Sequence, residues 1–217
     1  MSNYGIIFDC DGTLVDSLSA TLTSFHYAIM QVEGKERSSP EITKYFGRAA
    51  DFIFINVLGD EEKGLLAFSH FKEHQALQIL HLHEGIAEML EKIIEQKIPM
   101  GIVTGRHSDD LEIMLRPHGI SKHFVTMITD NQLKQPKPSP EGILLAASKM
   151  GLDPGNTLYV GDSPMDIQAA RAAGATSVAA LWDLPAERSV LENEHPDFLA
   201  ERPEDVLRIF KEFVFKG

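Results

Sequence analysis

Short apolar runs, each ending abruptly at a polar or small residue, recur along this chain. The first is IIF at residues 6–8, and four more are PMGIVTG at 99–105, FVTMITD at 124–130, NTLYVGDS at 156–163 and ATSVAAL at 175–181. Runs of this length without alternation predict strands that are buried on both faces of a sheet.

Helical patterns separate these runs. Apolar residues recur three and four positions apart at Ile86, Met89, Leu90, Ile93 and Ile94, at Leu111, Met114 and Leu115, at Ile143, Leu144 and Ala147, and at Ile167, Ala170 and Ala173. Strands that alternate with helices predict an α/β fold with a parallel sheet and helices on both of its faces. Ligands bind at the carboxyl ends of the strands in such sheets. Asp9, Thr104 and Asp162 are therefore expected at one site.

One region interrupts the alternation. Residues 17–82 contain helical patterns broken by EGKERSSP, FGRAAD and LGDEEKG, and no strand is expected there. We predict a helical cap over residues 17–82, inserted into a catalytic core formed by residues 1–16 and 83–217.

Composition and charge restrict the function. The formal charge of −12 argues against nucleic-acid binding, which needs clustered Lys and Arg. No apolar run is long enough to span a bilayer and no leader pattern precedes the first strand, so a soluble cytoplasmic protein without membrane contact, a monomer or a homodimer, is expected. Cys10 is the single cysteine, which excludes an internal disulfide, and we expect it to point into the core.

The candidate chemistry lies at the strand ends. Asp9 and Asp11 end the first run, and Asp11-Gly12 is also an ordinary turn signal. Lys137 precedes a predicted helix, with Lys134 nearby as a competitor. Asp162 ends the run TLYV, and Asp166 sits where an acid would also cap a helix that begins with Ser and Pro.

Together these residues fit phosphoryl transfer from a monoester. A carboxylate can attack phosphorus only if cations neutralise the substrate, and Mg²⁺ held by carboxylates together with a lysine would do so. A hydroxyl and backbone N–H groups would bind the phosphoryl oxygens, and a second carboxylate would transfer the proton.

The stretches DCDGTLVDS, GIVTGR, KPSPEG and YVGDSPMDIQAARAAG resemble, in order, the four motifs of the haloacid dehalogenase-like superfamily. The resemblance implies a Rossmann-like core with a helical cap inserted after the first motif. It also implies that Asp9 is the nucleophile, Asp11 the general acid and base, and Lys137 the residue that neutralises the phosphoryl charge. Thr104 and the Gly105 N–H would bind phosphate. Asp9, the Asp11 carbonyl and Asp162 would hold Mg²⁺, with Asp166 beside or behind them.

The wording of the first and fourth motifs is most similar to the phosphoglycolate phosphatase-like group. The predicted function is hydrolysis of a small phosphorylated metabolite through an aspartyl-phosphate. A β-phosphoglucomutase-like mutase is an alternative, as is a signalling receiver, a different class that also clusters Asp, Thr and Lys. Asp11 argues against true dehalogenases, which lack a second acid.

Two cap features complete the predictions. Gly47 and Arg48 lie at a break between cap helices, where Arg48 could pair with a carboxylate at the far end of a small phosphate ester; alternatively, Gly47 ends a helix and Arg48 is solvated. His81 and His83 lack an obvious third ligand, and we expect them to be surface or hinge residues rather than a metal site.

Overall fold

The computed structural model describes residues 3–78, 80–183 and 188–216. Within them, six parallel strands form the main sheet in the order β5-β4-β1-β6-β7-β8. Their bounds are β1 Gly5–Phe8, β4 Met100–Thr104, β5 Thr126–Thr129, β6 Thr157–Gly161, β7 Thr176–Ala180 and β8 Phe198–Ala200. The five strands expected from the apolar runs are confirmed, and β8 was not predicted.

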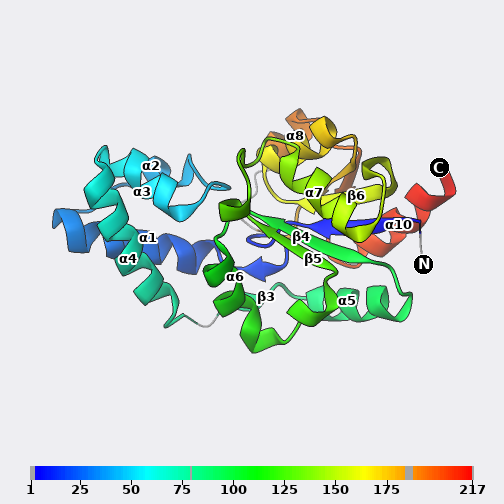
Figure 1. The fold of residues 1–217 in the computed structure, drawn as a ribbon, viewed down its shortest axis with the longest axis horizontal. Helices are drawn as coiled ribbons and strands as arrows, with labels where there is room; N and C mark the ends of the chain where they lie inside the picture. Colours follow the sequence, from blue (N-terminus) through cyan, green and yellow to red (C-terminus); the bar gives the residue numbers. More distant parts are fainter. Residues whose placement is uncertain (1–2, 79, 184–187, 217) are drawn as a thin grey trace.

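Helices cover both faces of this sheet (Figure 1). Those on one face are α5 Ile86–Glu95, α6 Ser108–Leu115 and α10 Asp205–Lys216, and those on the other are α7 Glu141–Met150 and α8 Pro164–Ala173; α9 spans Arg188–Asn193. Short 3-10 turns occupy Arg116–His118, Ser121–His123, Asp130–Gln132 and Pro154–Asn156. The α/β class with helices on both faces of a parallel sheet is confirmed.

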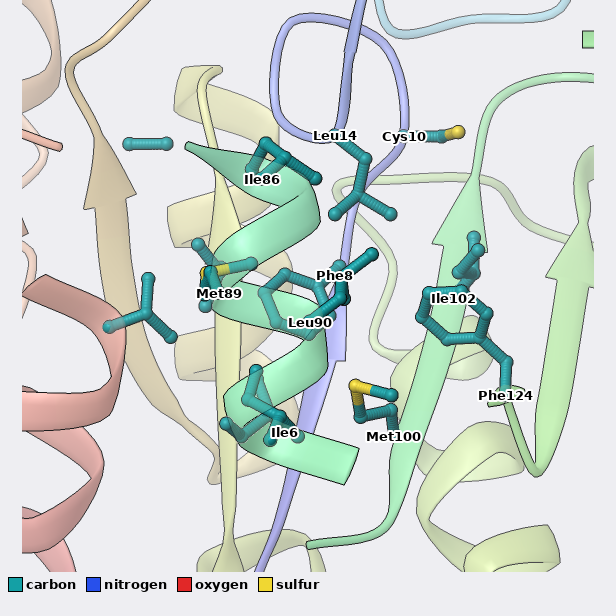
Figure 2. Packing of buried hydrophobic residues seen from close by; sticks show 14 of the residues in the cluster. Ile6, Phe8, Cys10, Leu14, Ile86, Met89, Leu90, Met100, Ile102 and Phe124 are labelled. Atoms are coloured by element: carbon teal, nitrogen blue, oxygen red, sulfur yellow. The ribbon is translucent and has the colours of Figure 1, made fainter. Parts of the chain in front are cut away.

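The core explains why β1 lacks a polar face. Ile6 and Phe8 point into one apolar layer, where they pack with Met89 of α5 and Ile102 of β4 (Figure 2). Ile7 points into the opposite layer, under α7 and α8. Cys10 is fully buried at the end of the strand, as expected, and burial raises the pKa of its thiol well above its usual value.

A helical cap lies at the carboxyl ends of the strands (Figure 1). It comprises α1 Leu18–Glu33, α2 Ser39–Thr43, α3 Ala50–Leu58 and α4 Glu61–Gln75. Its own apolar centre contains Phe25, Phe54 and Phe71, whose rings contact one another. None of the helices in the described part of the chain is long and apolar enough to cross a membrane.

Two short strands connect the cap to the core. β2 (Val15–Asp16) and β3 (His81–Leu82) pair antiparallel and form the two chain passages between the units. The expectation that residues 17–82 contain no strand is wrong at β3. A strand of two residues is too short to show a period, and it forms here because β2 supplies its partner.

Candidate active site

The loop after β1 places two carboxylates at the edge of the sheet. The Asp9 N–H donates to the Val160 carbonyl at 2.8 Å, so the backbone ladder reaches Asp9, whose side chain is buried. The chain then turns at Gly12, which has φ +71°. A Cβ at Gly12 would lie 2.3 Å from Asp162 Oδ2, so this turn needs glycine for both its conformation and its contact.

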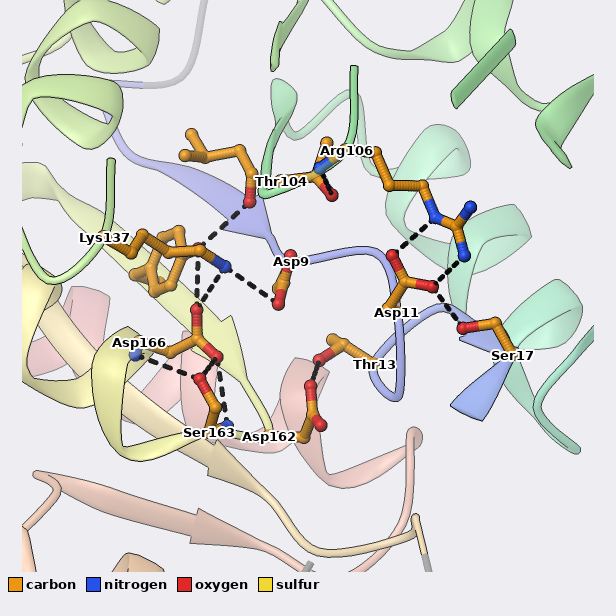
Figure 3. A network of polar contacts seen from close by, with 12 residues as sticks. Asp9, Asp11, Thr13, Ser17, Thr104, Arg106, Lys137, Asp162, Ser163 and Asp166 are labelled. Atoms are coloured by element: carbon orange, nitrogen blue, oxygen red, sulfur yellow. Dashed lines mark hydrogen bonds and ion pairs between the residues drawn. The ribbon is translucent and has the colours of Figure 1, made fainter. Parts of the chain in front are cut away.

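Lys137 lies between two of the acids (Figure 3). Its Nζ is 2.9 Å from Asp9 Oδ2 and 2.7 Å from Asp166 Oδ1, and its side chain is only 4% exposed. Burial acts to lower the pKa of Lys137, but Asp166 and Asp9 together raise it well above its usual value. The competing Lys134 is exposed at the surface. The fold therefore brings Lys137, and not Lys134, to the candidate site.

Asp166 both caps α8 and holds Lys137. Its Oδ2 accepts from the Ser163 N–H at 3.0 Å and the Ser163 hydroxyl at 2.5 Å, which forms the capping box that the sequence suggests. Its Oδ1 faces Lys137 and the hydroxyl of Tyr159, the latter at 3.1 Å. Both oxygens thus have partners, which places Asp166 behind the acids that are free to bind a cation. Tyr159 was not singled out from the sequence.

Asp9 and Asp162, with Asp166 behind them, have the properties of a divalent-cation site. Oxygens of Asp9, Asp162 and Asp166 lie within 4.8 Å of one another, and Asp9 Oδ1 is buried without a hydrogen-bond partner among the described residues. Burial raises the pKa of Asp9 to about 7 although Lys137 opposes it, and burial also raises the pKa of Asp162 well above its usual value. With one lysine against three acids, the cluster has excess negative charge, and a hard cation with oxygen ligands fits it.

Asp11 points away from Asp9. Arg106 donates to both of its oxygens, from Nε to Oδ2 at 2.7 Å and from Nη2 to Oδ1 at 2.6 Å, and the Ser17 hydroxyl donates to Oδ1 as well (Figure 3). Burial by itself would raise the pKa of Asp11, but Arg106 and Ser17 lower it below its usual value. The sequence analysis missed Arg106, although its position directly after Thr104 and Gly105 at a strand end was a usable signal.

Cap and core share one cavity above these residues. Asp9, Thr104, Gly105 and Asp162 line it from the core, and Arg48 lines it from the loop between α2 and α3. The cavity offers about 130 Å³ to water-sized molecules. This space suits a small ligand.

Thr104 and Arg48, which both line this cavity, contact neighbouring residues. The Thr104 hydroxyl accepts from the Arg106 N–H at 3.2 Å, and its own proton remains available to a ligand. The Arg48 guanidinium stacks on the Phe52 ring at 3.9 Å, and Arg48 Nε is buried without a partner among the described residues. Arg48 therefore lies at the cap side of the cavity with its guanidinium against Phe52 and near Asp130, and it is not fully solvated.

His81 lies in β3 and His83 directly after it, where the chain passes from the cap to the core. His83 also comes within 4.8 Å of Asp16 and Asp183, counted between possible ligand atoms. Burial lowers the pKa of His83, and Asp16 opposes this shift. The sequence did not reveal this grouping, because its members are brought together from β2, β3 and the loop after β7.

Fold and site together define an α/β enzyme with an acid cluster at the carboxyl ends of its strands. The family model described as "Haloacid dehalogenase-like hydrolase" matches residues 6–180, and the chain belongs to this family. The resemblance inferred from the four motifs is confirmed, and so is the expectation of an enzyme. The family match and the helical insertion both argue against a signalling receiver.

Curated relatives cover nearly the whole chain. The chain is 31% identical over 212 residues to "Pyrophosphatase PpaX" of Oceanobacillus iheyensis, with 96% of this chain and 97% of the relative covered. It is 27% identical to "Phosphoglycolate phosphatase" of Vibrio parahaemolyticus, with 94% of each covered. Among solved structures, a predicted phosphoglycolate phosphatase from Haemophilus somnus has a TM-score of 0.86 at 26% identity, covering 96% of this chain and 99% of that one.

Proposed function

We propose that the enzyme is a Mg²⁺-dependent phosphatase that hydrolyses a small phosphorylated metabolite through an aspartyl-phosphate on Asp9. The observation that carries this proposal is the position of Lys137 between Asp9 and Asp166, beside a buried Asp9 oxygen for which the described residues offer no hydrogen-bond partner. Asp9 and Asp162 would hold the ion with the Asp11 carbonyl, and Asp166 would support them from behind. The ion would supply positive charge to the acids and to the phosphoryl oxygens.

In the first half of the reaction, an Asp9 oxygen attacks phosphorus and the bond from phosphorus to the ester oxygen breaks. The leaving oxygen takes a proton from the Asp11 carboxyl group. Lys137 offsets the charge of the transferring group, and the Thr104 hydroxyl and the Gly105 N–H donate to its oxygens.

In the second half, water attacks phosphorus and gives its proton to the Asp11 carboxylate. The bond from phosphorus to Asp9 breaks, which releases inorganic phosphate and restores the Asp9 carboxylate. Proton and charge balance because Asp11 gives one proton and regains one.

The substrate is a phosphoglycolate-like monoester in this proposal. Two observations support a small substrate with a second anionic group: the limited size of the cavity and the presence of Arg48 at its wall. The names of the relatives agree with that class, because pyrophosphate and phosphoglycolate are both small phosphoryl compounds that carry further negative charge. The mutase alternative would instead require a phosphosugar to bind again as the acceptor.

The test is Asp9→Asn, compared with Asp60→Asn as a matched control. Asp60 caps α4 by accepting from the Lys63 N–H, and asparagine caps helices equally well. With Mg²⁺ present, the rate of phosphate release by Asp9→Asn should be below about one-thousandth of the wild-type rate. Its circular dichroism spectrum should be unchanged. Intact-mass analysis of wild type quenched during turnover should show one added phosphoryl group, absent in Asp9→Asn. Substantial activity in Asp9→Asn would assign the nucleophile elsewhere.

A further inference from the structure

The Asp11 carboxylate is fully engaged at its own side of the cavity. Arg106 makes two parallel hydrogen bonds to it, at 2.7 and 2.6 Å, and Ser17 donates to one of the same oxygens. This bidentate pairing is the strongest geometry available to a carboxylate and a guanidinium. Figure 3 shows the carboxylate turned toward Arg106 and away from Asp9. In this arrangement Asp11 cannot also serve a leaving oxygen above Asp9.

Arg106 joins the core to the cap. It belongs to the loop between β4 and α6, and its Nη2 donates to the Thr21 hydroxyl on α1 at 3.1 Å as well as to Asp11. Its side chain is only 10% exposed, yet it lines the cavity that also contains Asp9. A ligand in the cavity therefore meets the same guanidinium that holds Asp11.

A second arginine is among the residues that line this cavity. Arg48 lines it from the cap, and its Nε has no partner among the described residues. The third cation of the site, Lys137, is already held by Asp9 and Asp166. The two arginines offer guanidinium partners to a second anionic group of a ligand, apart from the phosphoryl group that Lys137 would contact, while Asp110, beside Arg106 on the same lining, opposes an anion there.

We propose that Arg106 holds Asp11 away from the leaving oxygen until a second anionic group of the substrate takes its place on the guanidinium. We call this arrangement the Arg106 gate. This inference rests on the proposed phosphatase function and adds to it. A carboxylate or second phosphoryl group binds between Arg106 and Arg48 and takes the place of Asp11 on the Arg106 guanidinium. Once released from Arg106, the Asp11 carboxylate takes up a proton from water, turns toward the leaving oxygen and gives that proton to it.

The exchange explains how substrate choice would act on turnover. With an anionic far end, one charge-assisted pair replaces another, and the release of Asp11 costs little. With a neutral far end, the Arg106–Asp11 pair must break without replacement, and the buried guanidinium keeps only the Thr21 hydroxyl and the nearby Asp110. Such a substrate can bind through its phosphoryl group, but its leaving oxygen receives no proton. The discrimination should therefore appear mainly in kcat and less in KM.

The experiment compares phosphoglycolate with phosphoglycolamide, which has a neutral amide in place of the carboxylate. Arg106→Met keeps the length of the side chain and removes its donors. The variant should lose roughly 10- to 100-fold in kcat/KM on phosphoglycolate. On phosphoglycolamide its kcat should rise several-fold above wild type, because only the Ser17 hydroxyl then holds Asp11.

Arg37→Met is the matched control, because Arg37 pairs with Glu33 on the cap surface, outside this cavity. It should leave both rates as in wild type. If Arg106→Met loses activity equally on both substrates, or gains nothing on the amide, the gate is wrong. If thermal melts show that Arg106→Met is poorly folded, Arg106→Lys is tested instead. A single ammonium holds Asp11 less tightly than a guanidinium, so we expect a smaller loss of kcat/KM on phosphoglycolate and a smaller rise of kcat on phosphoglycolamide. A different result would contradict the proposed function itself: the wild-type enzyme would release no phosphate from any of the esters.

Discussion

The backbone of Gly47 in the cap lies directly against Gly105 in the core. A Cβ added at Gly105 would come within 2.5 Å of the Gly47 carbonyl oxygen, a distance that real Cβ atoms do not adopt. The core loop that carries the candidate phosphate-binding N–H thus touches the cap loop that carries Arg48. A larger residue such as serine or asparagine would not fit at this position beneath the cap loop as it lies here.

The first prediction follows from this contact. Gly105→Ala should displace the loop of Gly47 and Arg48 and lower kcat/KM on phosphoglycolate about 10- to 100-fold, because a shift of an ångström at a binding site has effects of this size. The melting temperature should change little, since the contact is at the cavity mouth. Gly155→Ala is the control: its new Cβ would meet only the Asp153 carboxylate, at 3.2 Å, and the Gly174 carbonyl, at 3.8 Å. Full activity in Gly105→Ala would mean that the cap functions without this contact.

The second prediction concerns Lys137. Lys137→Met removes the ammonium between Asp9 and Asp166 and leaves buried carboxylates facing each other, which should lower the free energy of unfolding by about 3–5 kcal/mol. Because Lys137 lowers the pKa of Asp9, its loss should raise that pKa further, and the deficit should grow as the pH rises and the acids ionise. Urea unfolding below and above neutral pH measures both effects. Lys134→Met, at an exposed lysine, should be near wild type; equal losses in the two variants would contradict the prediction.

The third prediction is a pH dependence of stability and of Mg²⁺ binding. The pKa of Asp9 is about 7 in the folded metal-free protein, against 3.8 for an ordinary aspartate. The folded state therefore binds the proton more tightly, and this group's contribution to stability should be present at acidic pH and lost as the pH rises through about 4 to 7. Mg²⁺ needs the ionised acids, so its stabilising effect should increase over the same range.

Thermal melts in EDTA and in excess MgCl₂, near pH 5 and near pH 8, measure this coupling. The difference in melting temperature between the two conditions should be larger at the higher pH. Asp9→Asn should flatten the pH dependence in EDTA and shrink the Mg²⁺ effect. A Mg²⁺ effect of the same size at both pH values would show that the ion does not bind at Asp9.

The fourth prediction concerns Arg48 as a ligand of the far end of the substrate. Arg48→Ala should remove a charge-assisted contact of about 1.5–3 kcal/mol, a loss of about 10- to 100-fold in kcat/KM on phosphoglycolate. The loss on p-nitrophenyl phosphate, which has no carboxylate, should be much smaller. Lys44→Ala is the control, since Lys44 is an exposed cation of the same cap that lies over the Tyr45 ring. Parallel losses on both substrates would return Arg48 to a structural role.

Much of the fold follows from local signals in the sequence. Burial on both faces leaves β1 with no polar position, and the spacing of Ile86, Met89, Leu90 and Ile93 matches the buried side of α5. A parallel sheet then brings its carboxyl ends to one edge, so Asp9, Thr104 and Asp162 meet for topological reasons alone. The short strands β3 and β8 lack such a signal, because two or three residues show no period and depend on the partner that pairs with them.

The tertiary structure decided which charges pair. Nothing in the spacing of the chain distinguishes Lys137 from Lys134; burial does, because only Lys137 reaches the enclosed acids. Arg106 lies 95 residues from Asp11, and their pairing depends on the direction of two side chains across adjacent strand ends. The sequence by itself determined the elements, their order and the acids at their ends. The directions of the side chains, the contact of Gly47 with Gly105 and the partner of each buried charge were decided only by packing, since these depend on distances in space that sequence spacing does not contain.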